Sequence, residues 1–296
     1  MNCYSAFGLI VSSVIELRGF APAMAEPDVA ISFGKVPESL PDILHKGVLF
    51  QAAHGKFLLS INDVARYLVL SGKEIIIEPA PGAQLRDIEI FLTSSAFGAL
   101  LFQRGIYAFH GSALQYNDSG IIISGRSGAG KSTLTAVLLK RNLQLITDDL
   151  CAIYKNSDLY PVILPGTRYI KLWQDSMNKL DISLVDKVKV RENIEKYILP
   201  VTAIVTEPVK VSAVFVLQVR NTKEIEVEEI KGFAKLNLLR SNTFRYQFVK
   251  GLDITQIHFE AMSLVGRNAR IFKLYRPQNG FSAEELADAL IGTLET

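Results

Sequence analysis

The chain has 296 residues, of which 49% are hydrophobic and 21% are charged. This apolar content is sufficient for a packed core and excludes an intrinsically disordered chain, while the length allows one large domain or two modest ones. The formal net charge is only +2, from 32 basic and 30 acidic residues. A balance this even gives no electrostatic basis for binding nucleic acid or a membrane surface, so we expect neither as a partner.

The first segment to interpret is the apolar run 7–15, which is followed by Ala23-Met24-Ala25, a sequence that resembles a signal-peptidase site. The run has no basic residue before it, Glu16 and Arg18 interrupt it, and it is too short to span a bilayer. We therefore expect a strand here rather than a signal peptide.

The two cysteines, Cys3 and Cys151, are far apart in the sequence and form no C-x-x-C pair. We expect neither a cysteine metal site nor a disulfide framework from them. Together with the absence of a signal peptide, this usage predicts a reduced, cytoplasmic protein.

Short extended runs separated by prolines and glycines follow one another in the first part of the chain, as in a β-rich unit. The expected strands are 9–17, 29–33, 57–61, 67–70 and 74–78. The prolines and glycine of 79–82 then break the pattern. We predict a β-rich unit over residues 1–85 and a second domain over residues 86–296.

The second domain begins with an apolar stretch, 88–103, that is long enough for a buried helix of about four turns. Strand-like runs follow at 106–108 and 112–116, and a turn at 117–120 leads into an apolar, mostly β-branched run at 121–124. We therefore expect a hairpin that leads directly into the glycine-rich segment after residue 124.

That segment, Gly125-x-x-x-x-Gly130-Lys131-Ser132, matches the P-loop pattern at every fixed position, and the apolar spacing of 133–140 predicts the helix that should follow. Glycines let the backbone fold around a phosphate and direct its N–H groups inward, at the positive end of that helix. Lys131 would contact the β- and γ-phosphates, and the Ser132 hydroxyl would contact Mg²⁺. The alternative is an ordinary Gly/Ser connection. The predicted nucleotide-binding residues are Gly125, Arg126, Ser127, Gly128, Ala129, Gly130, Lys131, Ser132 and Thr133.

Downstream of this loop the pattern remains mixed, which predicts an α/β fold. The expected strands are 143–147, 150–154, 160–164, 169–173, 211–219 and 225–230, and the expected helices are 175–181, 234–239 and 282–294. We expect the strongly charged segment 187–200 to form a solvated loop.

Asp148 and Asp149 end the strand expected after the P-loop helix, so a parallel arrangement would bring them beside the loop. One carboxylate of such a pair can hold Mg²⁺ while the other accepts a hydroxyl proton. The alternative is a turn with two exposed acids, or a helix N-cap. His110, at the end of the preceding hairpin strand, is either structural, or a partner of these carboxylates or a phosphate contact.

Three segments in this order resemble the HPr kinase/phosphorylase family, and also its P-loop relatives, the phosphoenolpyruvate carboxykinases. They are His110-Gly111-Ser112-Ala113-Leu114, Ile123-Ser124-Gly125-Arg126-Ser127-Gly128-Ala129-Gly130-Lys131-Ser132 and Leu145-Ile146-Thr147-Asp148-Asp149. The resemblance implies an α/β fold with a P-loop HPr-kinase/PEP-carboxykinase-like core. It also implies ATP and Mg²⁺ as cofactors, with Asp148 as general base, Asp149 as a Mg²⁺ ligand, His110 supporting Asp148, and Lys131 acting on the phosphates.

The family's Arg-Gly-Leu-Gly signature after the core has no counterpart in this sequence. The chain is more similar to shorter HPr-kinase-like proteins, some of them from lasso-peptide biosynthesis clusters. Pro165-Gly166-Thr167-Arg168-Tyr169-Ile170-Lys171-Leu172-Trp173 and Glu195-Lys196 recur in those proteins. That resemblance makes Arg168, Lys171 and Lys196 candidates for substrate contacts, with ordinary surface charge as the alternative.

The function implied by this resemblance is ATP-dependent phosphorylation of a serine hydroxyl on a peptide or small protein. The C-terminal serine of a lasso-peptide precursor is the acceptor that the shorter relatives suggest, and a homo-oligomer is the assembly that the family suggests. The alternatives are a kinase acting on HPr or on a small metabolite, and a nucleotide-binding regulatory module without catalysis.

Overall fold

The computed structural model describes residues 2–185 and 187–296. It has a mixed α/β architecture with three sheets, which confirms the predicted α/β class. The chain forms two compact units. The first contains the residues up to Ala108 together with Phe244–Ala261, and the second contains Phe109–Thr243 and Met262–Thr296.

The first unit is built on a nine-stranded sheet with the order β3-β1-β2-β4-β9-β8-β7-β6-β5. Its strands are β1 (Asn2–Ala6), β2 (Leu9–Ser13), β3 (Ala21–Pro22), β4 (Val29–Phe33), β5 (His45–Lys46), β6 (Phe50–Ala53), β7 (Lys56–Ile61), β8 (Ala65–Leu70) and β9 (Glu74–Pro79). The apolar run near the N-terminus lies in the β1–β2 hairpin, as a strand. Its helices are α1 (Leu85–Phe91), the π-helical turn η1 (Leu92–Ala96), α2 (Phe97–Gln103) and α6 (Tyr246–Gly251).

The continuous helix α1–η1–α2 packs its apolar side on this sheet, because almost every side chain from Leu92 to Phe102 is apolar or small. Phe97 contacts the rings of Phe7 and Phe20 with centroid distances of 5.6 and 5.3 Å. This helical segment, expected over 88–103, and the distant segment 244–261 both lie in the first unit, although the expected boundary near residue 85 assigned them to the second domain.

The second unit contains an eight-stranded sheet, a three-stranded sheet and four complete helices among its described residues. Its strands are β10 (Tyr107–Tyr116), β11 (Ser119–Gly125), β12 (Gln144–Thr147), β13 (Leu150–Lys155), β14 (Pro161–Ile163), β15 (Tyr169–Trp173), β16 (Val188–Arg191), β17 (Ile194–Pro200), β18 (Val209–Arg220), β19 (Glu226–Glu229) and β20 (Arg270–Pro277). Its helices are α3 (Lys131–Lys140), α4 (Gln174–Lys179), α5 (Ala234–Ser241) and α8 (Ala283–Leu294). Two elements, β10 and α7 (Thr255–Asn268), begin in the first unit and end in the second.

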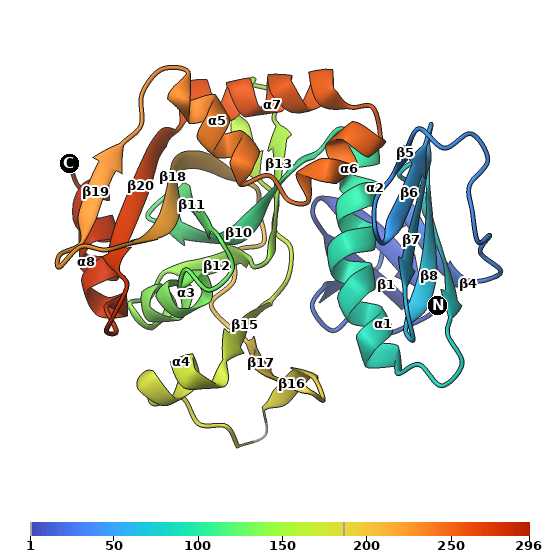
Figure 1. Cartoon of the computed structure of the whole chain (residues 1–296), viewed down its shortest axis with the longest axis horizontal. Coiled ribbons are helices and arrows are strands. Elements are labelled where there is room, and N and C mark those ends of the chain that lie inside the picture. The colour runs from blue at the N-terminus through green and yellow to red at the C-terminus, as the bar shows by residue number, and fades with distance from the viewer. Residues whose placement is uncertain (1, 186) are drawn as a thin grey trace. The chain divides into compact units, whose positions relative to one another are not determined.

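The larger sheet has the order β11-β10-β13-β14-β18-β20-β19, with β12 on β10 and a further pairing of β11 with β18. Helices α3 and α8 pack together beneath it, and α5 covers the other face (Figure 1). β12 runs in the same direction as β11, but β10 lies between them and pairs antiparallel with both. The sequence suggested that the strand ending at Asp148-Asp149 lies directly beside the strand that leads into the loop. Instead β10 separates β12 from β11, and the aspartates still lie near the loop because both strands pair with β10.

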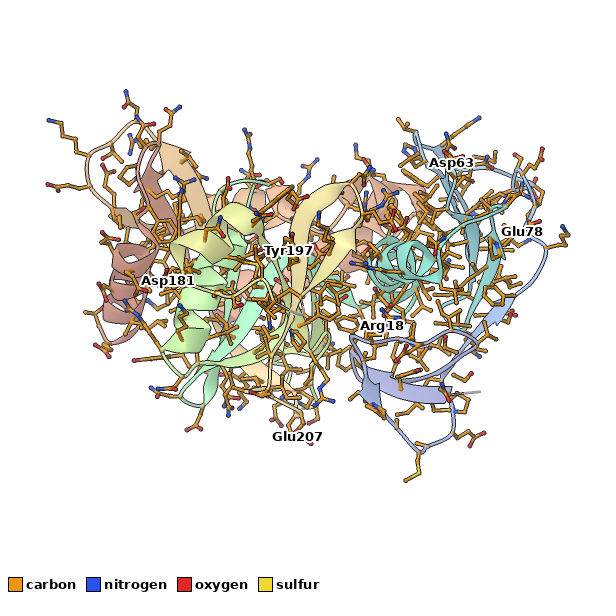
Figure 2. All side chains as sticks on the ribbon, turned by 90° about the horizontal axis from the view of Figure 1, so that it is seen from below. Arg18, Asp63, Glu78, Asp181, Tyr197 and Glu207 are labelled. Carbon is orange, nitrogen blue, oxygen red and sulfur yellow. The ribbon has the colours of Figure 1, made fainter. Side chains whose placement is uncertain are left out.

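The three-stranded sheet has the order β15-β17-β16, and it corrects the expectation that 187–200 is a solvated loop. In β17, labelled in Figure 2 at Tyr197, the buried residues Tyr197 and Leu199 alternate with partly or fully exposed neighbours. Tyr197 and Leu199 join the core that contains Ile170 and Leu172 of β15. The charges that suggested a loop belong to a hairpin instead, in which Lys189 of β16 forms an ion pair with Glu195 of β17.

No helix in the described part of the chain is both long and apolar enough to cross a membrane.

Candidate active site

The glycine-rich loop joins the end of β11 to the first residue of α3, as the P-loop pattern predicts. Gly125 has φ 137°, and a Cβ on it would lie 2.4 Å from the carbonyl oxygen of Leu217 on the neighbouring strand β18. Gly130, immediately before α3, has φ 106°. Both positions favour glycine, because residues with side chains rarely adopt a positive φ. These two glycines allow the sharp turn between β11 and α3.

Lys131 folds back over the loop that precedes it. Its Nζ donates to the carbonyl oxygens of Gly125, at 2.8 Å, and Arg126, at 3.2 Å. Burial lowers the pKa of Lys131, and the nearby charges of Asp149 and Asp148 oppose that effect. The ammonium group therefore lies at the mouth of the loop, where a phosphate group would meet it.

Arg276, near the end of β20, supports the loop, a contact that the sequence analysis did not predict. Its Nε donates to the carbonyl oxygen of Ala129 at 2.7 Å, and one of its terminal nitrogens lies 3.4 Å from the carbonyl oxygen of Gly128. No local motif marks this arginine. Only the parallel pairing of β20 with β18 brings it to the loop.

Asp148 is 4% exposed and is held on both carboxylate oxygens. The Ser112 hydroxyl donates to Oδ1 at 2.6 Å, and the backbone N–H of Lys171 donates to Oδ2 at 3.1 Å. The backbone N–H of Asp148 also donates to the Thr167 hydroxyl. Burial and the adjacent charge of Asp149 nevertheless raise the pKa of the Asp148 carboxyl. A carboxylate with a raised pKa and a fixed orientation is suited to accept a proton.

Asp149 is in the opposite electrostatic situation. Its Oδ2 lies 3.0 Å from Nζ of Lys171, and its Oδ1 lies 3.4 Å from Nδ1 of His110. Burial alone would raise the pKa of Asp149, but the charges of Lys171 and His110 outweigh it and hold the pKa well below its usual range. Asp149 therefore remains a carboxylate throughout the physiological pH range.

His110 faces Asp149 with one ring nitrogen. Nδ1 lies 3.2 Å from the backbone oxygen of Asp149 as well as near its carboxylate. Because both neighbours are acceptors, Nδ1 is the nitrogen that carries the proton. Burial lowers the pKa of His110, and the charge of Asp149 only partly opposes this. The direct contacts of His110 are therefore with Asp149, whereas the resemblance implied support for Asp148.

A cavity of about 220 Å³ brings most of the predicted site residues together. It is lined by His110, Gly111, Ser127, Gly128, Gly130, Lys131, Ser132, Thr133, Asp148, Asp149, Lys171, Trp173, Ser176 and Lys196. Three predicted loop residues, Gly125, Arg126 and Ala129, line a second cavity instead. Arg168 is exposed and lines neither cavity, so the structure does not bring it to the site.

Three of the lining residues, Gly111, Trp173 and Ser176, were not among the predicted site residues. Nζ of Lys196 lies 5.7 Å from the centroid of the Trp173 ring, in cation–π geometry. The hydroxyl of Ser176, in α4, lies 2.8 Å from that of Thr133, in α3. The small sheet and α4 thus form one wall of the cavity. The segments Pro165–Trp173 and Glu195-Lys196 were the sequence signals for that wall.

Among the residues that line the cavity, Ser132 and Asp149 would offer Mg²⁺ a hydroxyl and a carboxylate, while the Asp148 carboxylate accepts hydrogen bonds from Ser112 and the Lys171 backbone. In the part of the chain that the structure describes, no group of three or more His, Cys, Asp and Glu residues could hold a metal by itself. The donor set nevertheless fits Mg²⁺ at a phosphoryl-transfer site, because this ion usually binds one or two carboxylates and takes its remaining ligands from water and substrate phosphates.

Comparison with known families finds the same region. The family model for the HPr Serine kinase C-terminal domain matches residues 105–167, which include His110, the glycine-rich loop and both aspartates. Among solved structures, the Hpr(Ser) kinase/phosphatase from Coxiella burnetii matches with 15% identity and a TM-score of 0.33, over 64% of this chain and 90% of that chain. This score is too low to establish a common overall fold. No protein of curated function matches the sequence. Residues 105–167 are thus similar to the C-terminal domain of HPr serine kinases.

Proposed function

We propose that this chain is an ATP-dependent serine kinase that transfers the γ-phosphate to a serine hydroxyl of a peptide or small protein. The observation that carries the proposal is the buried carboxylate of Asp148, which has a raised pKa and faces the same cavity as Lys131. Phosphoryl transfer to a hydroxyl requires a loop that holds the phosphates and a base that accepts the hydroxyl proton. The similarity of residues 105–167 to HPr serine kinases supports the same reaction.

In this reaction the serine oxygen forms a bond to the γ-phosphorus, and the bond from that phosphorus to the β,γ-bridging oxygen breaks, leaving ADP. The serine proton passes to Asp148, whose orientation Ser112 and the backbone of Lys171 fix. The backbone N–H groups of the loop and the Lys131 ammonium stabilise the charge on the phosphate oxygens.

Ser132 and Asp149 are the residues that would hold Mg²⁺. When bound, the ion supplies positive charge that neutralises the phosphate oxygens. Lys171 and His110 keep Asp149 ionised and oriented for this role. Lys196, on the opposite wall, would contact the phosphate or the acceptor, and its position beside Trp173 in the cavity lining supports this.

We infer the acceptor class from the resemblance to short HPr-kinase-like proteins, which favours the C-terminal serine of a lasso-peptide precursor. The family resemblance suggests a homo-oligomer, and the cysteine usage suggests a cytoplasmic protein. HPr itself or a small metabolite is the alternative acceptor. All three acceptor classes require the same base and the same loop.

The test is incubation with ATP and Mg²⁺ in the presence of HPr, free serine or peptides that end in serine, followed by intact-mass measurement. We expect one added phosphate on a peptide with the wild type and none with Asp148→Asn. Asp158→Asn is the matched control, because Asp158 is an exposed turn residue outside the cavity. ATP binding without transfer to any acceptor would contradict the kinase proposal and favour a nucleotide-binding regulatory module.

A further inference from the structure

A second cavity, of about 630 Å³, borders the same glycine-rich loop. Its lining comes from three elements that are far apart in the sequence. They are the loop residues from Gly125 to Ala129, the end of β18 and the C-terminal end of α5. Ser127 and Gly128 line both this cavity and the catalytic one. A ligand held by the loop therefore has access to both.

The two volumes suit different parts of a nucleotide. Cavities that enclose small organic ligands span about 300–1,000 Å³. The catalytic cavity, at about 220 Å³, falls below this range and is polar, as a site for phosphates and an acceptor hydroxyl should be. The second cavity, at about 630 Å³, lies within the range and has room for a nucleoside.

The lining of the second cavity combines apolar walls with one uncommitted carboxamide. Phe215 and Leu217 of β18 belong to the core shared with α3 and α8, so strand alternation directs Val216 and Gln218 to the other face, toward α5. Leu238 of α5 lines the cavity with them. Gln218 is half-buried, and its side chain makes no hydrogen bond within the described residues. A carboxamide presents both donors and an acceptor, which is the complement of a nucleobase edge.

The backbone of β18 offers further hydrogen-bonding groups at this point. The last register pair between β11 and β18 is Gly125 with Leu217, whereas β18 continues to Arg220. Beyond Leu217, the edge of β18 that faces the loop therefore has no partner strand among the residues that the structure describes. Backbone donors and acceptors along such an edge need partners, and a planar heteroaromatic ring can supply them.

We propose that this second cavity binds the base of the nucleoside triphosphate, with Gln218 bonding its polar edge and Val216 and Leu238 contacting its faces. The proposal rests on the proposed function, because it assumes that the glycine-rich loop holds the phosphates. It adds the base-binding residues, which no sequence motif in the chain indicates.

The test is calorimetric titration with two probes, the non-transferable imido analogue of ATP and inorganic tripolyphosphate, each with Mg²⁺. In the wild type we expect the analogue to bind more tightly than tripolyphosphate, because only the analogue has a base. Gln218→Leu should weaken binding of the analogue about tenfold, the loss expected for one or two hydrogen bonds, and leave tripolyphosphate binding unchanged. Ser241→Trp, at an exposed position on the rim, should do the same by filling the cavity.

Gln144→Leu is the matched control, because Gln144 is an exposed glutamine of β12 that lines neither cavity. Unchanged binding of the analogue in both cavity variants would overturn the proposal, as would equal loss for both probes or equal wild-type affinity for both probes. A wild type that binds neither probe would instead overturn nucleotide binding, and with it the proposed function.

Discussion

Asp148 and Asp149 are adjacent in the chain and share one cavity, but their surroundings shift their pKa values in opposite directions. Asp148 accepts hydrogen bonds from Ser112 and the Lys171 backbone and has no cation in direct contact, so burial dominates. Asp149 has direct contacts with Lys171 and His110, and their electrostatic effect outweighs that of burial. The two carboxylates therefore contribute with opposite sign to the stability of the fold.

The first prediction concerns this difference. A folded-state pKa above the usual 3.8 means that the native state binds the Asp148 proton more tightly than the unfolded state, so its stability falls as the pH rises through that pKa. Asp148→Asn should therefore raise the melting temperature at pH 7 by about 2–4 °C, for a gain of about 1 kcal/mol. The asparagine can accept from the Lys171 N–H and donate to Ser112. The gain should vanish below pH 3.8.

Asp149→Asn is the adjacent control, with the opposite expectation. The pKa of Asp149 is depressed, so its carboxylate stabilises the fold above its usual pKa of 3.8 and loses this contribution as the pH falls. Removing it leaves Lys171, which is nearly buried, without its partner and should lower stability at pH 7 by about 1–3 kcal/mol. Thermal melts of both variants from pH 3 to 8 measure this, and a loss of stability in Asp148→Asn would refute the assignment.

The second prediction concerns the hydroxyl of Ser112, whose hydrogen bond lowers the pKa of Asp148 against the effect of burial. In Ser112→Ala that pKa should rise further. We expect the acidic limb of the kcat/KM profile to move up by about one pH unit, since a hydrogen bond to a charged group is worth roughly 1.5–3 kcal/mol and one pKa unit about 1.4 kcal/mol. Activity should fall more at pH 6 than at pH 9.

Ser124→Ala is the control for this measurement. Ser124 is also a buried serine of the hairpin, but its hydroxyl bonds the His110 carbonyl and Asn242, not Asp148. It should leave the acidic limb in place. An equal shift in both variants would show that the limb reports general disturbance of the hairpin.

At the scale of elements, the site depends on how closely β11 and β18 pair at the beginning of the loop. A Cβ at Gly125 would lie 2.4 Å from the Leu217 carbonyl oxygen, and Gly125 also has a positive φ. Gly128 also has a positive φ, but a Cβ there would meet no atom within 4 Å. An alanine at Gly128 would therefore test the cost of the backbone dihedral alone. An alanine at Gly125 would test that cost together with the clash against β18.

The third prediction uses this pair. Gly125→Ala should push β11 away from β18 and lower the free energy of unfolding by about 2–4 kcal/mol, since overpacking and the left-handed dihedral both act. Gly128→Ala should cost about 1 kcal/mol, from the dihedral alone. Chemical denaturation of both variants gives the comparison, and equal losses would contradict the steric argument.

The sequence predicted a helix or strand correctly where its hydrophobic pattern matched the burial of its side chains in the fold. Strand 29–33 and strand 169–173 match β4 and β15 residue for residue, and the helix after the loop forms as expected. The hairpin β16–β17 was missed because its charges are dense. β20 was not anticipated, although Arg270–Tyr275 alternates, because its partner β18 lies some 50 residues earlier in the chain.

The same limit applies to the site. Lys131 and the two aspartates lie in local motifs, so the sequence could indicate them before any fold was known. Ser112 and Arg276 are different, because their contacts join residues 36 and 147 positions apart. Such contacts depend on which strands pair, and a single sequence gives no direct measure of pairing. The roles assigned to all these residues remain predictions until the variants are measured.

At the scale of the whole molecule, the chain enters the first unit twice. The segment Phe244–Ala261 returns to a unit formed by the residues up to Ala108. A boundary predicted from composition divides the sequence at a single position. It therefore could not assign a segment from the second half of the chain to the first unit. The return depends on aromatic packing. Phe248 of α6 lies 4.8 Å from Phe50 and 4.4 Å from Phe57, measured between ring centroids.

The fourth prediction is that this packing is a major source of stability for the first unit. Phe248 is fully buried, so Phe248→Ala leaves a cavity beside Phe50 and Phe57 and should cost about 3–5 kcal/mol. Phe233→Ala, at an 87% exposed position, removes the same side chain without a cavity and should cost less than about 0.5 kcal/mol. Hydrogen exchange at the amides of β6 and β7 should rise only in Phe248→Ala. Unchanged protection there would mean that the nine-stranded sheet is stable without the returning segment, and that the first unit is held together by the residues before 109 alone.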